Sequence, residues 1–232
     1  MGGIAKGSGM IHPNMGTMLC FLTTDCAISP VMIRAALKEV VSKTFNRISV
    51  DGDTSTNDTC FALASGAAAP DGPAFKPGTP AFDAFQRALD QLATTLARKM
   101  AADGEGATRL ITVTVRGAVT ADDADAAART VANSPLVKTA VYGHDANWGR
   151  VAAALGRSGA RFNQEDVDID ILGLPVCRAG LVVDFDEEEA LRRFEEPEVT
   201  IEVDLHAGEE SATMWTCDFS HEYVTINGDY RS

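Results

Sequence analysis

The most specific segment of this chain reads Lys6-Gly7-Ser8-Gly9-Met10-Ile11-His12-Pro13-Asn14-Met15-Gly16-Thr17-Met18-Leu19-Cys20-Phe21. It ends in a small residue, a threonine and an apolar run, which is the arrangement expected where a chain cleaves itself before a strand. In such a cleavage the Thr17 hydroxyl attacks the carbonyl carbon of Gly16, whose missing Cβ permits the distorted backbone. The new chain begins at Thr17, and its α-amine, with a pKa near ~8, is a general base for the neighbouring hydroxyl. Taken alone, the Gly-Thr pair also fits an ordinary junction between a loop and a strand.

Further segments of the chain belong with this one. Gly2-Gly3-Ile4-Ala5 precedes it, and Thr23-Thr24-Asp25 and the polar loop Asp51-Gly52-Asp53-Thr54-Ser55-Thr56-Asn57-Asp58 follow it. Later segments are residues 103–108, 133–140, 147–150 and 223–232. In these residues and in their order the chain resembles the ornithine acetyltransferases of arginine biosynthesis, also called bifunctional glutamate N-acetyltransferases. The resemblance spans the whole chain, which makes it highly specific.

The order of the expected elements favours α+β layers over a doubly wound parallel sheet. Ser29-Pro30 predicts a helix start, and apolar residues at helical spacing predict a second helix from residue 80. Residues 1–16 read as an ordered loop. The strands expected in the second half of the chain are 110–119, 167–172, 180–184, 198–205, 212–219 and 222–226.

The resemblance implies a more definite architecture than the periodicity does. It implies a layered α/β/β/α sandwich of the self-cleaving aminopeptidase and ornithine acetyltransferase type, with a smaller C-terminal α/β domain. Residues 1–16 would then end the first chain of the precursor, before the cleavage site. Residues 17–130 would form the half of the sandwich that carries the nucleophile, and residues 131–232 the C-terminal domain.

The reaction implied by the resemblance is acyl transfer by a ping-pong route. Thr17 takes the acetyl group from N2-acetylornithine, releases ornithine and passes the acetyl group to glutamate, in the cyclic pathway of arginine biosynthesis. A covalent ester divides a difficult amide exchange into two easier steps. The resemblance leaves open whether acetyl-CoA is a second acetyl donor, which would add N-acetylglutamate synthase activity; no bound cofactor is expected.

Two other functions remain open from the sequence. A hydrolase of the related self-cleaving aminopeptidase group would share the nucleophile but pass the acyl group to water. A non-catalytic half of a split protein would lack the reaction altogether. Lys6, Glu105 and the C-terminal tail favour the transferase over the hydrolase.

Four further residues are substrate-binding positions in the family's pattern. Lys6 would meet a substrate carboxylate, and Glu105, between two glycines, would meet the ammonium group of ornithine. Asn227 and Ser232 match the family's binding asparagine and its terminal hydroxyl residue. Without the resemblance, Lys6 and Glu105 would read as solvated surface charges, and a chain end usually frays. The chain departs from the family at Gly16, which is more often Ala, and at Ser232, which is usually Thr.

The resemblance also implies a partner chain. The tetrahedral intermediate needs an oxyanion hole, which the family takes from a Thr-Gly pair in the first (α) chain of the same precursor. We therefore expect this sequence to be the maturation segment plus the second (β) chain, with the first chain upstream of Met1. The expected assembly is a heterotetramer of two α and two β chains.

Composition restricts the other classes of partner. The net charge of −13 and the pI of about 4.6 argue against a nucleic-acid partner. The sequence contains no apolar run long enough for a membrane span and no signal peptide. The five cysteines form no CxxC pair, and the four histidines have no zinc spacing. A calcium loop that starts at Asp51 would need glycine at its sixth position and glutamate at its twelfth, where this chain has Thr56 and Ala62. We expect a cytoplasmic protein without a metal.

Overall fold

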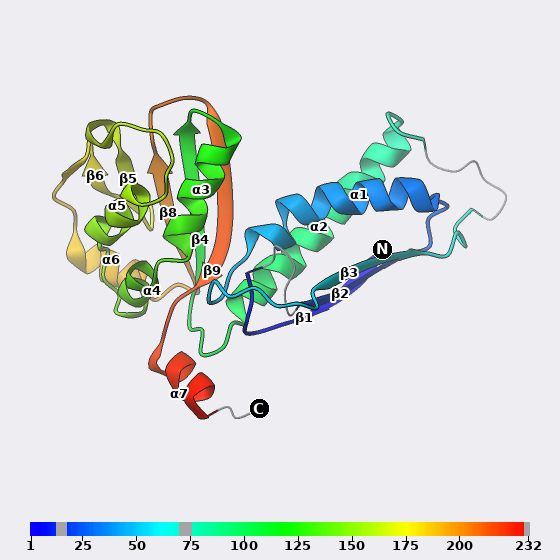
Figure 1. The fold of residues 1–232 in the computed structure, drawn as a ribbon, viewed down its shortest axis with the longest axis horizontal. Coiled ribbons are helices and arrows are strands. Elements are labelled where there is room, and N and C mark those ends of the chain that lie inside the picture. The colour runs from blue at the N-terminus through cyan, green and yellow to red at the C-terminus, as the bar shows by residue number, and fades with distance from the viewer. Residues whose placement is uncertain (13–17, 70–75, 230–232) are drawn as a thin grey trace. The chain divides into compact units, whose positions relative to one another are not determined.

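A computed structural model describes residues 1–12, 18–69 and 76–229 of the chain (Figure 1). These residues form two units, Met1–Met100 and Ala101–Ser232. The division differs from the expected domain boundary at residue 130. Residues 101–130 belong to the second unit because the strand β4 (Leu110–Ala118) pairs with the later strands β8 (Glu198–Asp204) and β9 (Glu210–Cys217).

The described part of the first unit contains a three-stranded sheet in the order β1-β2-β3. The strands are β1 (Gly2–Lys6), β2 (Leu19–Thr24) and β3 (Thr59–Ala64). β1 runs antiparallel to β2, and β2 runs parallel to β3. The helices α1 (Pro30–Lys43) and α2 (Pro80–Ala102) lie on one side of this sheet (Figure 1). A short 3-10 turn, Phe45–Arg47, follows α1.

Local chemistry explains both helices of this unit. The Ser29 hydroxyl accepts a hydrogen bond from the backbone N–H of Met32, and Pro30 begins α1, as predicted. α2 buries one stripe of apolar side chains spaced three or four residues apart: Phe85, Leu89, Ala93, Ala97 and Met100. The alternation along β2 gives the sheet two different faces. Cys20 and Leu22 are buried, whereas Leu19 and Phe21 are exposed.

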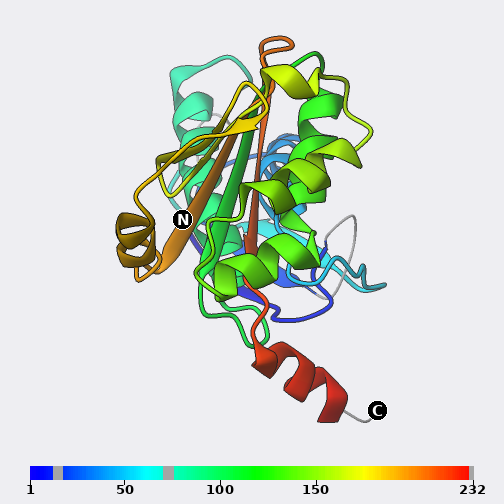
Figure 2. The ribbon, with the colours of Figure 1, turned by 90° about the vertical axis from the view of Figure 1, so that its left-hand side faces the viewer.

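The second unit contains a six-stranded mixed sheet in the order β7-β6-β5-β8-β4-β9 within residues 101–229. Its remaining strands are β5 (Asp168–Ile171), β6 (Leu174–Arg178) and β7 (Leu181–Val182). The helix α3 (Ala121–Ala132) packs on β4 and β9, and α4 (Pro135–Tyr142) and α5 (Trp148–Gly156) pack against α3 (Figure 2). A 3-10 turn (Gln164–Asp166), α6 (Glu187–Arg193) and α7 (His221–Asp229) complete the unit. Its core is continuous through the fully buried Ile111, Val113, Val199, Ile201 and Met214.

The helices and mixed sheets confirm the predicted α+β class, but three elements differ from the prediction. Residues 2–6 form β1 rather than a loop, and β6 forms where no strand was expected. Residues 222–226 lie within the helix α7, so the predicted strand is wrong. No helix in the described ranges has both the length and the apolar character needed to cross a membrane.

Candidate active site

The predicted nucleophile Thr17 and its neighbour Gly16 fall in residues 13–17, outside the described residues, as does Ser232. The structure does describe the residues on both sides of the predicted cleavage point. Residues 10–12 precede it, and Met18 follows it directly.

The upstream flank is bound by Asp51. Its two carboxylate oxygens accept hydrogen bonds from the backbone N–H groups of Met10, at 2.7 Å, and Ile11, at 3.1 Å. The Ile11 carbonyl oxygen in turn accepts from the Val50 N–H at 2.7 Å, and the Ile11 side chain is fully buried. Thr54 adds a hydrogen bond from its hydroxyl to the His12 carbonyl oxygen at 3.1 Å.

The downstream flank is bound by the other end of the same loop. The backbone N–H of Met18 donates to Oδ1 of Asp58, and the Met18 carbonyl oxygen accepts from the Thr59 N–H at 2.9 Å. Both peptide groups of Met18 are therefore fixed by two consecutive residues. The loop of residues 51–58 thus binds the chain before and after the predicted cleavage point.

The acidic side chains at the two ends of this loop bind backbone N–H groups. Asp51 also accepts from the N–H of Asp53 at 3.2 Å, so its carboxylate bonds partly to its own loop. Within the described residues, no cluster of three or more histidine, cysteine, aspartate or glutamate side chains is suited to a metal ion.

Lys6 reaches this region from β1. It is the last residue of that strand and pairs in register with Leu19, the first residue of β2. Leu19 pairs on its other side with Thr59 of β3. The start of β2, two residues after Thr17, is therefore flanked by Lys6 on one side and by Thr59, next to Asp58, on the other. Lys6 is exposed, and its contact with a substrate carboxylate stays a prediction.

A cavity of about 940 Å³ opens beside this strand start. Met18, Asp58, Thr59 and Cys60 line it from the strands, and α1 contributes charged and polar residues that include Arg34, Lys38 and Glu39. Burial raises the pKa of the Asp58 carboxyl, although the hydrogen bond from the Met18 N–H opposes this effect. The sequence pattern indicates the polar loop but does not distinguish Asp58 from the other acidic residues in it.

Two of the predicted binding residues meet in the second unit. The Asn227 side-chain amide donates to Oε2 of Glu105 at 2.9 Å and to the Tyr223 carbonyl oxygen at 3.0 Å. Glu105 lies in the turn before β4, and Asn227 lies on α7, so residues far apart in sequence form one polar pair. Oε1 of Glu105, which is partly exposed, takes no part in this hydrogen bond. A carboxylate held in this way suits an ammonium ligand.

Buried polar contacts hold α7 against the Glu105 turn. Asp218 accepts hydrogen bonds from the backbone N–H groups of Thr108, at 2.7 Å, and Arg109, at 2.9 Å. The Ser220 hydroxyl donates to the Gly106 carbonyl oxygen and accepts from the Glu222 N–H at 3.2 Å. These contacts connect the end of β9 and the start of α7 to residues 106–109. Asp218 and Ser220 belong to no motif of the sequence and were not predicted.

Lys138 fixes the same segment from α4. Its side chain is only 1% exposed, and its ammonium donates to the Thr216 hydroxyl at 2.7 Å and to the Cys217 carbonyl oxygen. The ammonium also lies 4.5 Å from the centre of the Phe219 ring. Lys138 belongs to the segment of residues 133–140, and nothing in the sequence of that segment indicates that the lysine is buried.

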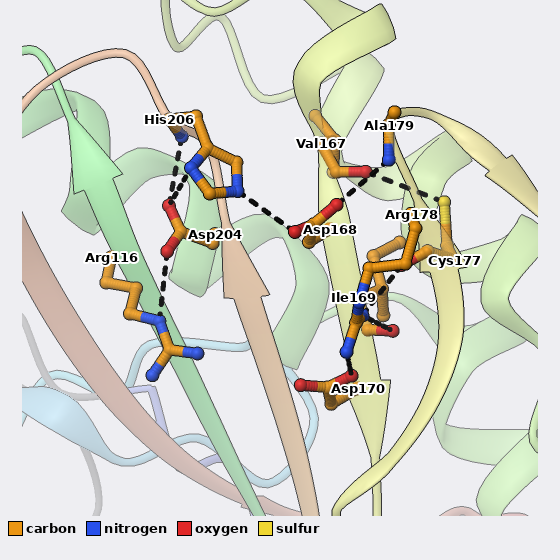
Figure 3. A network of polar contacts seen from close by, with 10 residues as sticks. All are labelled: Arg116, Val167, Asp168, Ile169, Asp170, Cys177, Arg178, Ala179, Asp204 and His206. Atoms are coloured by element: carbon orange, nitrogen blue, oxygen red, sulfur yellow. Dashed lines mark hydrogen bonds and ion pairs between the residues drawn. The ribbon is translucent and has the colours of Figure 1, made fainter.

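A second polar network lies on the sheet of this unit, centred on His206 after β8 (Figure 3). Its Nε2 lies 3.0 Å from Oδ2 of Asp168, and Asp204 accepts from the His206 backbone N–H at 3.0 Å. Asp168 also accepts from the Ala179 N–H at 2.9 Å, and Arg116 donates to Asp204 at 3.2 Å. These side chains join β4, β5 and β8 to the turn after β6, so the network has a structural explanation.

The fold and a match along the whole sequence place the chain in one class of protein. The model of the ArgJ family matches residues 1–232, and the chain belongs to that family. The resemblance found in the sequence is therefore confirmed. The "Arginine biosynthesis bifunctional protein ArgJ" of Symbiobacterium thermophilum is 53% identical over 232 residues, and that of Chlorobium chlorochromatii is 52% identical over 230 residues.

These matches cover all or nearly all of this chain but only part of each relative. They cover 100% of this chain and 57% of the Symbiobacterium protein, and 99% of this chain and 53% of the Chlorobium protein. The chain therefore spans little more than half the length of these relatives. In the crystal structure of the arginine biosynthesis bifunctional protein ArgJ from Bacillus halodurans, a chain 43% identical in sequence superposes with a TM-score of 0.87. That match covers 90% of this chain and 98% of the crystallised one.

Proposed function

We propose that this chain is the maturation segment and second chain of a glutamate N-acetyltransferase in arginine biosynthesis. It moves an acetyl group from N2-acetylornithine to glutamate through an acetyl ester on Thr17, after cleavage between Gly16 and Thr17. The observation that carries the proposal is identity near 50% over the whole chain to relatives named for arginine biosynthesis.

The described geometry supports the assignment of Thr17 as the nucleophile. One loop binds residues 10–12 and Met18, so the chain is held on both sides of the predicted scissile bond.

The substrate-binding assignments rest on charge. In the proposal, Lys6 binds a substrate carboxylate, and Glu105, held by Asn227, binds the ammonium group of ornithine. Ser232 completes the site through its hydroxyl. No resident cofactor takes part; acetyl-CoA enters as a second acetyl donor if the enzyme also makes N-acetylglutamate from it.

The proposal includes the first chain of the precursor as a partner. The relatives carry a further part of their sequence beyond the matched region, and in the proposal that part supplies the oxyanion hole and assembles with this chain as a heterotetramer. The exposed apolar face of the β1-β2-β3 sheet supports a protein partner, because Ile4 and Phe61 are 70% and 49% exposed there.

Intact mass spectrometry tests the function. The chain is produced with the N-terminal part of the Symbiobacterium relative placed before residue 1 and is then incubated with N2-acetylornithine. We expect a chain that begins at Thr17 and gains one acetyl group, and we expect Thr17→Ala to abolish both changes. Acetyl transfer to glutamate distinguishes the transferase from a hydrolase, which would release acetate. A wild-type chain that stays whole and takes up no acetyl group would contradict the proposal.

A further inference from the structure

Two cysteines lie side by side in the sheet of the first unit. Cys20 on β2 and Cys60 on β3 are direct partners in the parallel register of the two strands. Such partners point to the same face of the sheet. The next pair along, Phe21 and Phe61, shows this by stacking its rings on the opposite face. Both cysteines are free thiols in the structure, and the proposed acetyl transfer uses neither of them.

We propose that Cys20 and Cys60 are a redox-active pair, which a hydroperoxide converts to a disulfide and a dithiol reductant converts back. The first support is their register. Neighbouring strands lie about 4.8 Å apart, which falls within the Cα separation of about 4.4–6.8 Å that a disulfide spans. The bond therefore needs no approach or separation of the two strands. This chemistry is independent of the proposed acetyl transfer.

The second support is a difference in exposure. The Cys20 side chain is fully buried, whereas Cys60 is partly exposed and lines the cavity of about 940 Å³. The exposed charged residues Arg34, Lys38 and Glu39 of α1 line the same cavity, so it is solvated and admits small polar molecules. A hydroperoxide therefore reaches Cys60 first, and Cys20 meets only the oxidised form of Cys60.

The third support is the contact between the two thiols. The hydrogen bond with Cys20 lowers the pKa of the Cys60 thiol, although burial opposes this effect. The same contact, together with burial, raises the pKa of the Cys20 thiol. Because the thiolate is the form that attacks a peroxide, Cys60 is the sulfur that reacts with the oxidant. Cys20 is the sulfur that closes the disulfide.

The reaction balances with the hydroperoxide as the oxidant. The Cys60 thiolate attacks the terminal peroxide oxygen, the O–O bond breaks, and a Cys60 sulfenic acid forms. The leaving oxygen takes up the proton that the thiol had released, which gives an alcohol or water. The Cys20 sulfur then attacks the Cys60 sulfur, and hydroxide leaves as water with the Cys20 proton. A dithiol later reverses the bond by thiol–disulfide exchange and becomes a disulfide itself.

Peptide mapping tests the pair in the precursor that carries the N-terminal part of the Symbiobacterium relative before residue 1. The protein is reduced, treated with hydrogen peroxide, blocked with iodoacetamide and digested with trypsin, which cuts after Arg34 between the two cysteines. We expect a cross-link between the peptides that carry Cys20 and Cys60, and we expect dithiothreitol to remove it. Both cysteines follow residue 17, so the cross-link is expected whether or not the chain cleaves itself.

Three variants assign the roles. Cys20→Ala, a small apolar replacement for a buried thiol, should remove the cross-link. Its Cys60 sulfenic acid should persist, so that dimedone traps at least about fivefold more of it than in the wild type. Cys60→Ala should leave Cys20 reduced. The matched control is Cys26→Ser. Cys26 is also partly exposed and shares a tryptic peptide with Cys20, but it lies beyond the end of β2, so the cross-link should remain.

A folded wild type without a reducible link between residues 20 and 60 would overturn the inference. Equal trapping at Cys60 in the wild type and in Cys20→Ala would do the same, as would a cross-link that disappears in Cys26→Ser. If Cys20→Ala does not fold, as judged by thermal melting, the wild type and Cys26→Ser decide, because both must form the cross-link and lose it on reduction.

Discussion

Asp51 and Asp58 occupy the two ends of one loop, yet their carboxylates have different surroundings. Asp51 uses both oxygens on backbone N–H groups before the predicted cleavage point, whereas Asp58 uses one and keeps the other buried. The sequence shows two aspartates seven residues apart and cannot rank them, because the difference arises from where Met18 is placed. The resemblance did name Glu105 and Asn227 separately. Their 2.9 Å contact depends on the fold, since the two residues are 122 positions apart in the sequence.

His206 provides a prediction at the same scale. Its hydrogen bond to Asp168, reinforced by the charges of Asp204 and Asp166, raises its pKa above the ordinary 6.5. The stabilisation is therefore complete below pH ~6.5 and is lost as the pH rises through the higher folded pKa. Because the side chain is 48% exposed, the effect is at most about 0.5–1 kcal/mol. His206→Asn, which tolerates the positive φ of 46° at this position, removes the cation.

Thermal melting between about pH 5.5 and 8.5, a range that spans the titration of a histidine side chain, checks this expectation. The wild type should be the more stable protein at the acidic end, and the difference should shrink toward the alkaline end. Asp168→Asn removes the partner of the histidine and should flatten the same slope. Wild-type and His206→Asn melting curves that stay parallel over the whole range would show that the pair is not linked to protonation.

At the scale of the elements, the sequence predicted what is determined locally. α1 begins at its serine cap and proline. The apolar stripe of α2 and the alternation of apolar and polar residues along β4 predicted those two elements correctly. β1 was missed because glycine has low strand propensity and its place beside β2 depends on packing. A Cβ on Gly3 would lie 2.7 Å from the Leu22 side chain.

α7 was predicted as a strand because Tyr223, Val224, Thr225 and Ile226 favour strands. In the structure this segment follows Ser220, whose hydroxyl accepts from the Glu222 N–H, and it has no buried residue. Contacts with the Glu105 turn therefore override its propensity, which local sequence patterns cannot reveal. The short strand β6, which begins with Leu174 and Pro175, was also missed. It is a strand because it pairs with β5, and that pairing cannot be read from its local sequence.

Gly106 allows a prediction about this contact. Its φ is +68°, and a Cβ there would lie 2.5 Å from the backbone nitrogen of Tyr223. Gly106→Ala should therefore push α7 away from the Glu105 turn and destabilise the protein by about 1–3 kcal/mol. In the acetyl-uptake assay, the apparent affinity for N2-acetylornithine should fall, because the Asn227 amide would no longer hold the Glu105 carboxylate.

The matched control is Gly156→Ala at the end of α5, where a Cβ meets nothing within 4 Å and φ is not positive. There alanine should be neutral or stabilise the helix by up to about 1 kcal/mol. Chemical denaturation of both variants gives the comparison. An equal change in the two variants would mean that the contact between α7 and the turn does not constrain Glu105.

At the scale of the whole molecule, one face of the β1-β2-β3 sheet in the first unit carries exposed apolar side chains. Register places Ile4, Phe21 and Phe61 in one row across the three strands, and the rings of Phe21 and Phe61 stack with centres 5.6 Å apart. Leu19 and Leu63 extend the row along the strands, with exposures of 42% and 55%. Adjacent exposed apolar residues of this kind mark a protein-binding surface.

The relatives contain a further part of comparable size, so we expect the first chain of the precursor to cover this face. The double variant Phe21→Ser with Phe61→Ser should weaken binding of that chain by at least about 2 kcal/mol, roughly thirtyfold, because buried aromatic anchors dominate such interfaces. Co-purification with a tagged N-terminal part of the Symbiobacterium relative measures the loss. Val31→Ser makes a similar change on α1 at a 79% exposed position and should bind normally. Equal recovery of both variants would place the partner on another surface.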